Sequence, residues 1–584
     1  MNAEKPKDAG CFPLEWASDA IADLIGALGF EYIALNPGAS FRGLHDSVVN
    51  YLGNENPQIL LTLHEEHAVS IAHGYAKVTG KPMAVIVHSN VGLMHATMPV
   101  FNAWCDRVPI VILGATGPVD AARRRPWIDW IHTSLDQGAL IRDYTKWDDQ
   151  PASVRAALES LLRANLLCRT APCGPVYICF DMDLLEEKLD EKTDIPNVSR
   201  FLQAAPPHSS PSSISQAMKI LSHANNPLIL IGRTNRSKSG WDDRIRLAEV
   251  LGAKVLTDLK VGAGFPSEHP LNIVAPGEFL SPKTAALIRD SDAILSLDWV
   301  DLGGTLKRVW GTESVSAKVI QCSLDSYSHR AWSMDYQALP PVDLFSLSDT
   351  DTFVSDLLDE VEESRSSEKI KKGVETQSMD KFVQPVPFDE KADNKRGSIG
   401  FRDLAVSLNR IMSDRKTTII RVPIGWPGDL LHLRDPLDFL GNDGGAGLGA
   451  GPGIAVGASL ALKDSGRIPI AILGDGDFLM GVTALWTAAR YSIPLLIIVV
   501  NNRSFGNSEG HQKMIAKQRG RHSENNWIGT RIDDPAVDLS KIARAQGLKA
   551  GGPFADMSEL PEALSTAVKE VEKGSGYVLD ILVE

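Results

Sequence analysis

The 584-residue sequence contains little cysteine, no long hydrophobic run and no block of basic residues. Six cysteines are too few for a disulfide framework in a chain of this length, and Cys168, Cys173 and Cys179 lack the CxxC spacing of a zinc site. The longest apolar run, Ile493 to Val500, is far shorter than the ~20 residues of a membrane span. The first residues carry no apolar segment of the secretory type. These absences argue against a disulfide scaffold and a membrane protein, and a cytoplasmic location is expected.

The charge balance is acidic, with 73 acidic and 59 basic residues and a net charge of -14. An acidic chain without a Lys/Arg cluster is a poor binder of nucleic acids and anionic membranes, so neither is expected as a partner. Hydrophobic residues at 43% and charged residues at 23% are ordinary for a globular protein. Any phosphorylated ligand would be held locally, by glycine loops, helix N-termini or a metal ion.

Three blocks of alternating helical and strand-like patterns divide the sequence. Continuous apolar runs between helical segments are typical of parallel strands buried on both faces. We therefore predict an α/β fold of three doubly wound parallel-sheet domains, at residues 1–190, 205–360 and 400–584, with a charged linker at 361–399. The predicted strands are Gln58–Leu63, Met83–Val87, Pro109–Leu113, Pro227–Ile231, Lys254–Thr257, Ala293–Leu297, Thr417–Arg421, Ile468–Leu473, Ile493–Val500 and Tyr577–Val583, and helices are predicted at Glu65–Thr79 and Gly92–Trp104.

The most informative segment lies in the third block. Gly474-Asp475-Gly476 follows a predicted strand, a helical pattern comes next, and the following strand ends at Asn501-Asn502, with 24 residues between the two motifs. The carboxyl ends of parallel strands share one sheet edge, so Asp475 and Asn502 are expected to lie close together. Carboxylate and amide oxygens suit Mg²⁺ or Ca²⁺, and glycine amides at a helix start suit a phosphate. Either motif alone is a common turn, but together they predict a metal- and phosphate-binding site.

This pair of motifs resembles the GDG-to-NN signature of the thiamine diphosphate enzymes. The resemblance implies a diphosphate beside Gly474 and Gly476. Asp477 stands where relatives often have a small residue; its amide can face the diphosphate, while its carboxylate must point away or cap a helix. The resemblance also implies three protein ligands for Mg²⁺ (or Ca²⁺), namely Asp475, the side chain of Asn502 and the backbone carbonyl of Ser504.

A glycine-rich loop at residues 444–452 precedes an apolar helical pattern. It lacks the strand–GxGxxG–helix spacing and the later acidic residue of a dinucleotide site. Beside the thiamine motif, it resembles the segment that contacts the aminopyrimidine ring. The resemblance implies that Leu448 lies under the bent cofactor and that the carbonyl of Ala446 accepts a hydrogen bond from the 4′-amino group.

The first block contains the acid that thiamine chemistry requires. Glu65 stands nine positions before Gly74 of a Gly-Tyr-Ala element, where the family has the glutamate that hydrogen-bonds N1′ of the pyrimidine; Glu66 is the alternative. Two glutamates in a first helical turn are by themselves typical of a solvated helix start. Their concurrence with the distant motif makes Glu65 the predicted catalytic acid.

Histidines near this element are candidates for proton transfer. The run from Leu63 to Ile112, with Asn36–Ser40 and Asn102–Trp104, resembles the benzoylformate decarboxylases. That resemblance implies proton transfer by His88 and a cofactor contact by Pro37.

Two further features concern the same resemblance. Ala39 occupies the position of an active-site serine in those enzymes, so carboxylate recognition differs unless Ser40 substitutes. His269 is predicted as the second active-site histidine, with His95 as the alternative.

The acetohydroxyacid synthases share this layout, but several of their features are missing. Their Glu-Gln is Glu65-Glu66 here, their ITGQ element reads Leu113–Thr116 without glutamine, and residues 122–134 do not match their phenylalanine- and glutamine-bearing loop. We therefore do not expect FAD.

The sequence is thus predicted to be a thiamine diphosphate- and Mg²⁺-dependent carboxy-lyase that decarboxylates a small 2-oxo acid. The alternatives are an acetolactate synthase-like carboligase, a 2-hydroxyacyl-CoA lyase-type enzyme and a non-catalytic, cofactor-binding regulatory homologue. The resemblance implies a homodimer or homotetramer with the active site between subunits.

Overall fold

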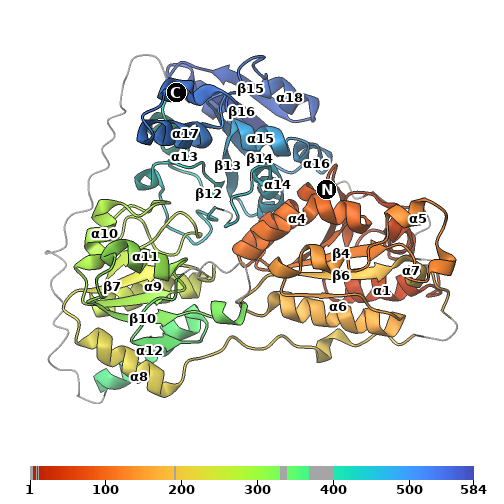
Figure 1. Ribbon diagram of the computed structural model, residues 1–584, viewed down its shortest axis with the longest axis horizontal. Coiled ribbons are helices and arrows are strands. Elements are labelled where there is room, and N and C mark those ends of the chain that lie inside the picture. Colours follow the sequence, from red (N-terminus) through yellow and green to blue (C-terminus); the bar gives the residue numbers. More distant parts are fainter. Residues whose placement is uncertain are drawn as a thin grey trace. The chain divides into compact units, whose positions relative to one another are not determined.

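The computed structural model describes residues 4–7, 10, 12–189, 193–328, 338–366, 399–442 and 444–583. Contacts divide the chain into two compact units. The first comprises Met1–Gln203, Asn394–Ile424 and Asp443–Glu584, and the second comprises Ala204–Asp393 and Gly425–Asn442. Three parallel sheets flanked by helices confirm the predicted α/β fold class (Figure 1). Most of the linker predicted at 361–399 lies outside the described residues.

The first sheet, in the first unit, has the strand order β2-β1-β3-β4-β6-β5, with all neighbours parallel. The carboxyl ends of its strands therefore meet at one edge. The strands are β1 (Tyr32–Leu35), β2 (Gln58–Leu61), β3 (Met83–Ile86), β4 (Ile110–Thr116), β5 (Trp147–Asp149) and β6 (Pro175–Asp181). The helices are α1 (Ala17–Ala27), α2 (Arg42–Asp46), α3 (Glu65–Thr79), α4 (Ser89–Cys105), α5 (Ile128–Ile131), α6 (Val154–Arg169) and α7 (Met182–Leu185).

The second sheet forms the core of the second unit, in the parallel order β11-β10-β9-β7-β8. Ile229 and Ile231 of β7 lie in one hydrophobic cluster, and Leu228 and Leu230 lie in another, so both faces of the sheet are covered. The strands are β7 (Pro227–Ile231), β8 (Lys254–Leu256), β9 (Ala293–Leu297), β10 (Lys318–Cys322) and β11 (Leu344–Ser346). The helices are α8 (Pro211–Ser222), α9 (Lys238–Leu251), α10 (Pro282–Arg289), α11 (Leu302–Trp310) and α12 (Thr350–Ser366).

The third sheet belongs to the first unit and has the parallel order β12-β13-β14-β16-β15. Its central strand, β14, is buried along its whole length, as its unbroken apolar sequence predicts. The strands are β12 (Thr417–Arg421), β13 (Ile468–Gly474), β14 (Leu495–Asn501), β15 (Lys549–Phe554) and β16 (Gly576–Leu582). The helices are α13 (Phe401–Met412), α14 (Ala450–Leu462), α15 (Asp475–Gly481), α16 (Ala484–Arg490), α17 (Gly506–Gln518), α18 (Leu539–Ala545) and α19 (Leu560–Glu572).

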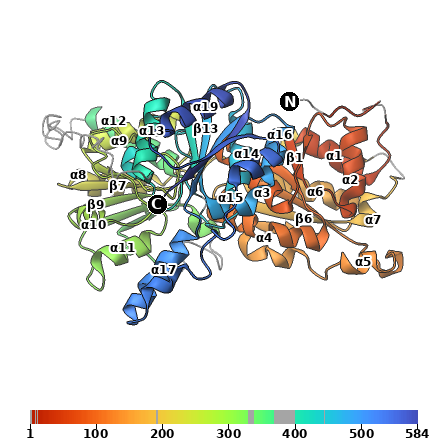
Figure 2. The same cartoon turned by 90° about the horizontal axis from the view of Figure 1, so that it is seen from above.

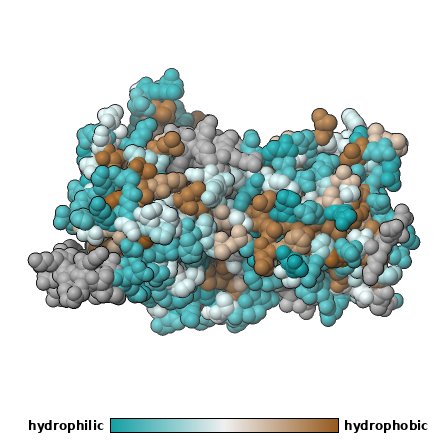
Figure 3. Space-filling model, turned by 90° about the horizontal axis from the view of Figure 1, so that it is seen from below, coloured by the Kyte–Doolittle hydropathy of each residue, from teal (hydrophilic) through white to brown (hydrophobic). Residues whose placement is uncertain are grey.

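The surface combines hydrophilic and hydrophobic residues. On the face drawn in Figure 3, hydrophilic residues predominate and hydrophobic residues occur in smaller groups between them. Among the described helices, none combines the length and apolar character needed to cross a membrane.

Helices α3 and α14 flank different sheets, yet they pack tightly against each other within the first unit (Figure 2). A Cβ atom on Gly74 would lie 2.0 Å from the carbonyl oxygen of Ile454, and one on Gly457 would lie 1.8 Å from that of Ile71. The two backbones therefore approach as closely as only glycine allows. Near the start of α3, His67 Nε2 lies 2.7 Å from Oγ1 of Thr483, the residue before α16.

This packing predicts that Gly74→Ala destabilises the first unit. The added methyl group has no space, and overpacking of this kind costs about 1–3 kcal/mol in the free energy of unfolding. Gly510→Ala is the matched control, because Gly510 also lies in a helix but has open space around its Cβ position. The control is expected to be neutral or up to about 1 kcal/mol more stable. Urea unfolding of both variants tests this, and equal stabilities would contradict the tight crossing.

Candidate active site

The two motifs of the third block come together at the carboxyl edge of its sheet. Gly474, at the end of β13, pairs in register with Val500 of β14, so Asp475 lies beside the end of β14. The backbone amide of Ser504 donates to Asp475 Oδ2 (3.2 Å) and to Asn502 Oδ1 (3.0 Å). The carboxylate and the amide oxygen therefore converge on one point.

The environment of Asp475 fits a cation. Burial raises the pKa of this carboxyl, although backbone amides, including those of Gly476, Arg503 and Ser504, hydrogen-bond to it. Among the described residues, none supplies Asp475 with an ion pair. A buried carboxylate held only by amides, next to an amide oxygen, is a donor set that suits Mg²⁺. Asn501, in contrast, donates to Asp580 inside the sheet (2.9 Å), which leaves Asn502 as the exposed asparagine.

The carboxylate of Asp477 points away from this cluster and caps a helix, as expected. Its Oδ1 accepts hydrogen bonds from the amides of Gly449 (2.7 Å) and Gly451 (3.3 Å) at the start of α14. Arg421 Nη2 lies 3.7 Å from Asp477 Oδ2. The negative charge thus faces the positive end of a helix dipole and a guanidinium. Asp477 thereby fixes the glycine-rich loop relative to α15.

The glycine-rich loop rests on α4 of the first sheet. The amide of Gly447 donates to Asn102 Oδ1 (3.2 Å), and a Cβ atom on Gly445 would lie 2.3 Å from the same oxygen. Ala446 has φ of 50°, in the left-handed region. Leu448 is 44% exposed despite its apolar side chain. The loop therefore presents the side chain of Leu448 outward, where a ligand can contact it.

Glu65 is buried at the start of α3. His95 Nδ1 lies 3.1 Å from Glu65 Oε2, and the side chain of Asn36 also hydrogen-bonds to this carboxyl. Burial raises the pKa of Glu65, but these two hydrogen bonds and one from its own backbone amide outweigh it, so the pKa is lowered overall. Gly92 is required beside it, because a Cβ atom there would lie 2.9 Å from Glu65 Oε1.

The neighbouring Glu66 turns toward the third block. Its Oε1 lies 3.0 Å from the position of a Cβ atom on Gly449. Burial and the charge of Asp477 raise the pKa of Glu66. Its backbone amide donates to His64 Nδ1 (3.1 Å), which caps the helix. The carboxyl groups of Glu65 and Glu66 are thus held in different environments. The approach of Glu66 to Gly449 also shows that the start of α3 adjoins the start of α14.

His88 lies at the carboxyl end of β3, immediately before α4. Its Nδ1 is 2.9 Å from Ser40 Oγ, which accepts a hydrogen bond from the amide of Ser89 (3.1 Å). A Cβ atom on Gly38 would lie 2.4 Å from His88 Cβ, so the Asn36–Ser40 segment packs directly on the histidine. Burial and His132 lower the pKa of His88, while Glu65 raises it. Ser40 therefore orients His88, and Pro37 and Ala39 are exposed beside it.

His269 belongs to the second unit, and both of its ring nitrogens have partners there. Its Nδ1 accepts a hydrogen bond from the amide of Leu271 (3.2 Å), and its Nε2 lies 3.3 Å from Glu249 Oε1. Its ring stands edge-on to Phe265 at 5.1 Å. An active-site role for His269 stays a prediction, whereas the alternative, His95, contacts Glu65.

Three residues of this region were not singled out from the sequence. Asn36 hydrogen-bonds to Glu65, His64 caps α3 and stacks on His95 at 4.7 Å, and His132 contacts the ring of His88 at 4.6 Å. Asn36 and His64 come directly after or close to the ends of β1 and β2, which was an available signal, whereas His132 follows α5 and has no such signal.

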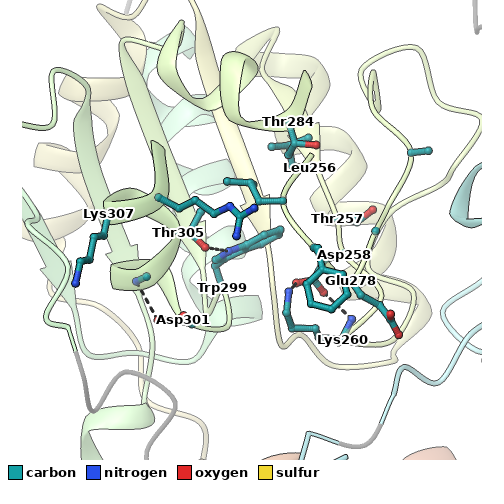
Figure 4. A pocket seen from close by; sticks show the side chains of 16 residues that line it. Leu256, Thr257, Asp258, Lys260, Glu278, Thr284, Trp299, Asp301, Thr305 and Lys307 are labelled. Atoms are coloured by element: carbon teal, nitrogen blue, oxygen red, sulfur yellow. Dashed lines mark hydrogen bonds and ion pairs between the residues drawn. The ribbon is translucent and has the colours of Figure 1, made fainter. Parts of the chain in front are cut away.

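The second unit contains a separate pocket of about 520 Å³, beside the ends of β8 and β9 (Figure 4). Lys307 and Arg308 of α11 contribute positive charge, while Lys260 pairs with Asp258 at 2.8 Å. The indole of Trp299 lines the pocket and donates to Thr305 (3.0 Å). Asp258, Glu278 and Asp301 also line the pocket, so its cations and carboxyls are balanced beside the aromatic wall.

Comparison with known proteins identifies relatives along the whole chain. A probable acetolactate synthase large subunit from Methanocaldococcus jannaschii is 25% identical over 578 residues, covering 97% of this chain and 92% of that protein. The structure of a thiamine diphosphate-dependent 4-hydroxybenzoylformate decarboxylase from Rhodococcus jostii has a TM-score of 0.76 at 21% identity, over 97% of this chain and 99% of that one. Benzoylformate decarboxylase from Polynucleobacter necessarius has a TM-score of 0.79 at 19% identity, over 98% and 99%. These structural matches establish the fold.

Family models cover the parts of the chain that form the site. The thiamine pyrophosphate enzyme N-terminal TPP binding domain matches residues 15–140, the central domain 214–330 and the C-terminal TPP binding domain 424–581. The first match contains Glu65 and His88, and the last contains Asp475 and Asn502. Since the models span both halves of the site and most of the chain, this protein belongs to the thiamine pyrophosphate enzyme family.

Proposed function

We propose that this chain is a thiamine diphosphate- and Mg²⁺-dependent 2-oxo acid decarboxylase. The observation that carries the proposal is the meeting of two half-sites in the first unit. Glu65 and His88 stand at the carboxyl edge of the first sheet, Asp475 and Asn502 stand at that of the third, and the starts of α3 and α14 adjoin each other.

Residues of the third sheet would hold the metal and the diphosphate. Asp475, Asn502 and the carbonyl of Ser504 are the proposed Mg²⁺ ligands, and the converging oxygens of the first two support this. Gly474 and Gly476, with the amide of Asp477, would border the diphosphate.

Residues around the exposed loop would hold the organic part of the cofactor. Leu448 would support it, the carbonyl of Ala446 would accept from its amino group, and Pro37 would border it from the first sheet. When bound, thiamine diphosphate supplies a carbon that adds to a carbonyl and stabilises the negative charge left by C–C cleavage.

The protein's own contribution is proton transfer. Glu65 is buried and held by Asn36 and His95, so it can exchange a proton with a pyrimidine nitrogen without large movement. The Ser40 hydroxyl accepts from the Ser89 amide and has a second lone pair, so it can also accept a hydrogen bond from Nδ1–H of protonated His88. His88 in that form would carry on Nε2 the proton that it gives to the product. His269 is a proposed second histidine of this site, with His95 as the alternative.

Two other reactions follow from specific observations. Relatives described as acetolactate synthases support carboligation, in which a second carbonyl replaces the proton. The pocket beside Lys307 and Arg308 supports a 2-hydroxyacyl-CoA lyase-type reaction, since it could accept a phosphate-bearing group. FAD is not expected, because the loop at 122–134 lacks the synthase pattern. A non-catalytic regulatory homologue would have had no need to keep Glu65, Leu448 and Asp475 together.

We also propose that the protein is a cytoplasmic homodimer or homotetramer. The two half-sites meet within one chain, so the expected position of the active site between subunits stays a prediction. Apolar side chains around the site are exposed in the single chain, as expected of a surface that another subunit covers. These side chains are Leu63, Met94, Met98, Leu448 and Met480, which are 44%, 51%, 36%, 44% and 57% exposed.

A substrate panel tests the reaction. We expect CO₂ and aldehyde release from at least one aliphatic or aromatic 2-oxo acid, dependent on added thiamine diphosphate and Mg²⁺. Parallel assays with an acceptor aldehyde, with 2-hydroxyacyl-CoA substrates and for acetolactate separate the alternatives. Absence of CO₂ from every 2-oxo acid would contradict the proposed decarboxylation.

Replacement of the buried metal ligand tests the cofactor site. We expect Asp475→Ala to abolish tight thiamine diphosphate binding by calorimetry, because the diphosphate then lacks its bridging cation. In the parent protein, EDTA should abolish binding and Mg²⁺ should restore it. Asp556→Ala is the control, since Asp556 is exposed in the same domain and bonds only within its own turn. Unchanged affinity in EDTA would contradict this assignment.

Paired substitutions distinguish the two glutamates. Glu65→Gln keeps the size and a hydrogen bond but removes the acid, so turnover should fall by at least the ~10²–10⁴ typical of lost acid–base catalysis. Hydrogen–deuterium exchange at C2 of the bound cofactor should slow in parallel. Glu66→Gln should have a much smaller effect on both rates. If Glu66→Gln were the damaging change and Glu65→Gln harmless, the assignment would be off by one residue.

A further inference from the structure

We propose that His132 is the proton-relay partner of His88, passing protons from solvent to His88 during turnover. This inference rests on the proposed function and deepens it, since it names the source of the proton that product release consumes. His132 lies in the segment 122–134, which follows β4.

The segment around His132 is firmly held. The carbonyl of His132 accepts from the amide of Gly117 (3.1 Å), and Asn90 Nδ2 donates to the carbonyl of Ile131 (3.2 Å). The buried carboxylate of Asp129, at the start of the same turn, is paired with Arg125 at 2.8 Å. These bonds fix the backbone at the sheet edge where His88 also stands. The position of His132 is therefore built into the fold.

The two imidazoles are in direct contact. Their ring centroids are 4.6 Å apart and the ring planes meet at 63°. Because Ser40 occupies Nδ1 of His88, the remaining nitrogen of that ring, Nε2, is available for proton exchange. Among the described residues, the two rings meet edge to face, without a hydrogen bond between their nitrogens. They are close enough for a proton to pass between them by way of one bridging water.

The charge of His132 acts on the protonation of His88. Burial lowers the pKa of His88, and the neighbouring His132 lowers it further, because two like charges in contact repel. The carboxylate of Glu65, on α3, raises the pKa of His88. The other charges nearby are the Asp129–Arg125 pair beneath His132 and His95 on the far side of Glu65. The charge of a protonated His132 therefore disfavours a proton on His88.

The position of His132 also connects the site to solvent. It is half-buried, and the flanking Trp127 and Trp130 are 70% and 75% exposed. Decarboxylation consumes one proton per turnover, since a 2-oxo acid anion and a proton give an aldehyde and CO₂. In the relay, protonated His88 gives its Nε2 proton to the substrate-derived carbon and becomes neutral, protonated His132 then returns a proton to His88, and a proton from solvent restores His132.

The test begins with a measurement that needs no substrate. His132→Asn keeps a polar side chain but removes the second imidazole, and the ring signals of histidine-labelled protein are followed by NMR against pH. We expect the pKa of His88 to rise in His132→Asn, because the repulsion is removed. His45→Asn is the control, since His45 is a half-buried histidine of the same domain that contacts Phe41. An unchanged His88 pKa would overturn the relay.

Kinetics on the substrate found by the panel complete the test. We expect His132→Asn to lower aldehyde output by about tenfold or more while C2 exchange stays within twofold of the parent, because C2 exchange depends on Glu65. The double variant His88→Ala/His132→Asn should release aldehyde no more slowly than His88→Ala alone, since the relay acts through His88. Thermal unfolding and a second variant, His132→Gln, control for loss of fold.

The outcomes separate this inference from the proposed function. Proportional loss of exchange and output in both His132 variants would make His132 structural and overturn the relay alone. The parent protein could instead show the expected effect of His132 on His88 but no thiamine-dependent turnover. That outcome would overturn the proposed function and the relay with it.

Discussion

The close crossing of α3 and α14 is the constraint on which the site depends. Gly74 and Gly457 let the two backbones touch, and the helices then carry the start of one half-site against the start of the other. Glu66 consequently lies at Gly449, within the electrostatic reach of Asp477. A larger side chain at either crossing glycine would separate the acid of the first sheet from the loop of the third. The packing of these two helices thus sets the distance between the two halves of the candidate site.

Four carboxyl groups gather around this crossing, and each is stabilised differently. Glu65 has hydrogen bonds from a histidine and an asparagine, and Asp477 has helix amides and a guanidinium. Burial and the charge of Asp477 raise the pKa of Glu66, which favours its neutral form. Among the described residues, Asp475 has backbone amides as its hydrogen-bond partners, and this is the basis for the proposed cation beside it. The different surroundings support the different roles proposed for these carboxyl groups.

The sequence predicted several central strands because burial determines them, but the interior strands β1, β6 and β10 were not predicted. The strands β7, β9 and β12 and the helix α3 have the predicted bounds, since apolar runs and a glycine stop define them. The edge strand β15 was not predicted, because its Lys-Ala-Gly-Gly-Pro-Phe sequence has no strand-like pattern. Family motifs located Glu65, Asp475 and Asn502. His132 was not predicted as a site residue, because its contact with His88 is formed by the fold and no local sequence pattern encodes it.

The balance between proton delivery and carbon capture determines what such a site produces. Once the C–C bond has broken, an available proton gives an aldehyde, whereas a second carbonyl in a site poor in acids gives a hydroxyketone. Here imidazoles lie on both sides of Glu65, with His64 and His95 stacked on one side and His88 and His132 in contact on the other. Imidazole is the side chain that exchanges protons most readily near neutral pH. A site so well supplied with proton carriers would favour release of the protonated product over its capture, and this supports the proposed decarboxylation.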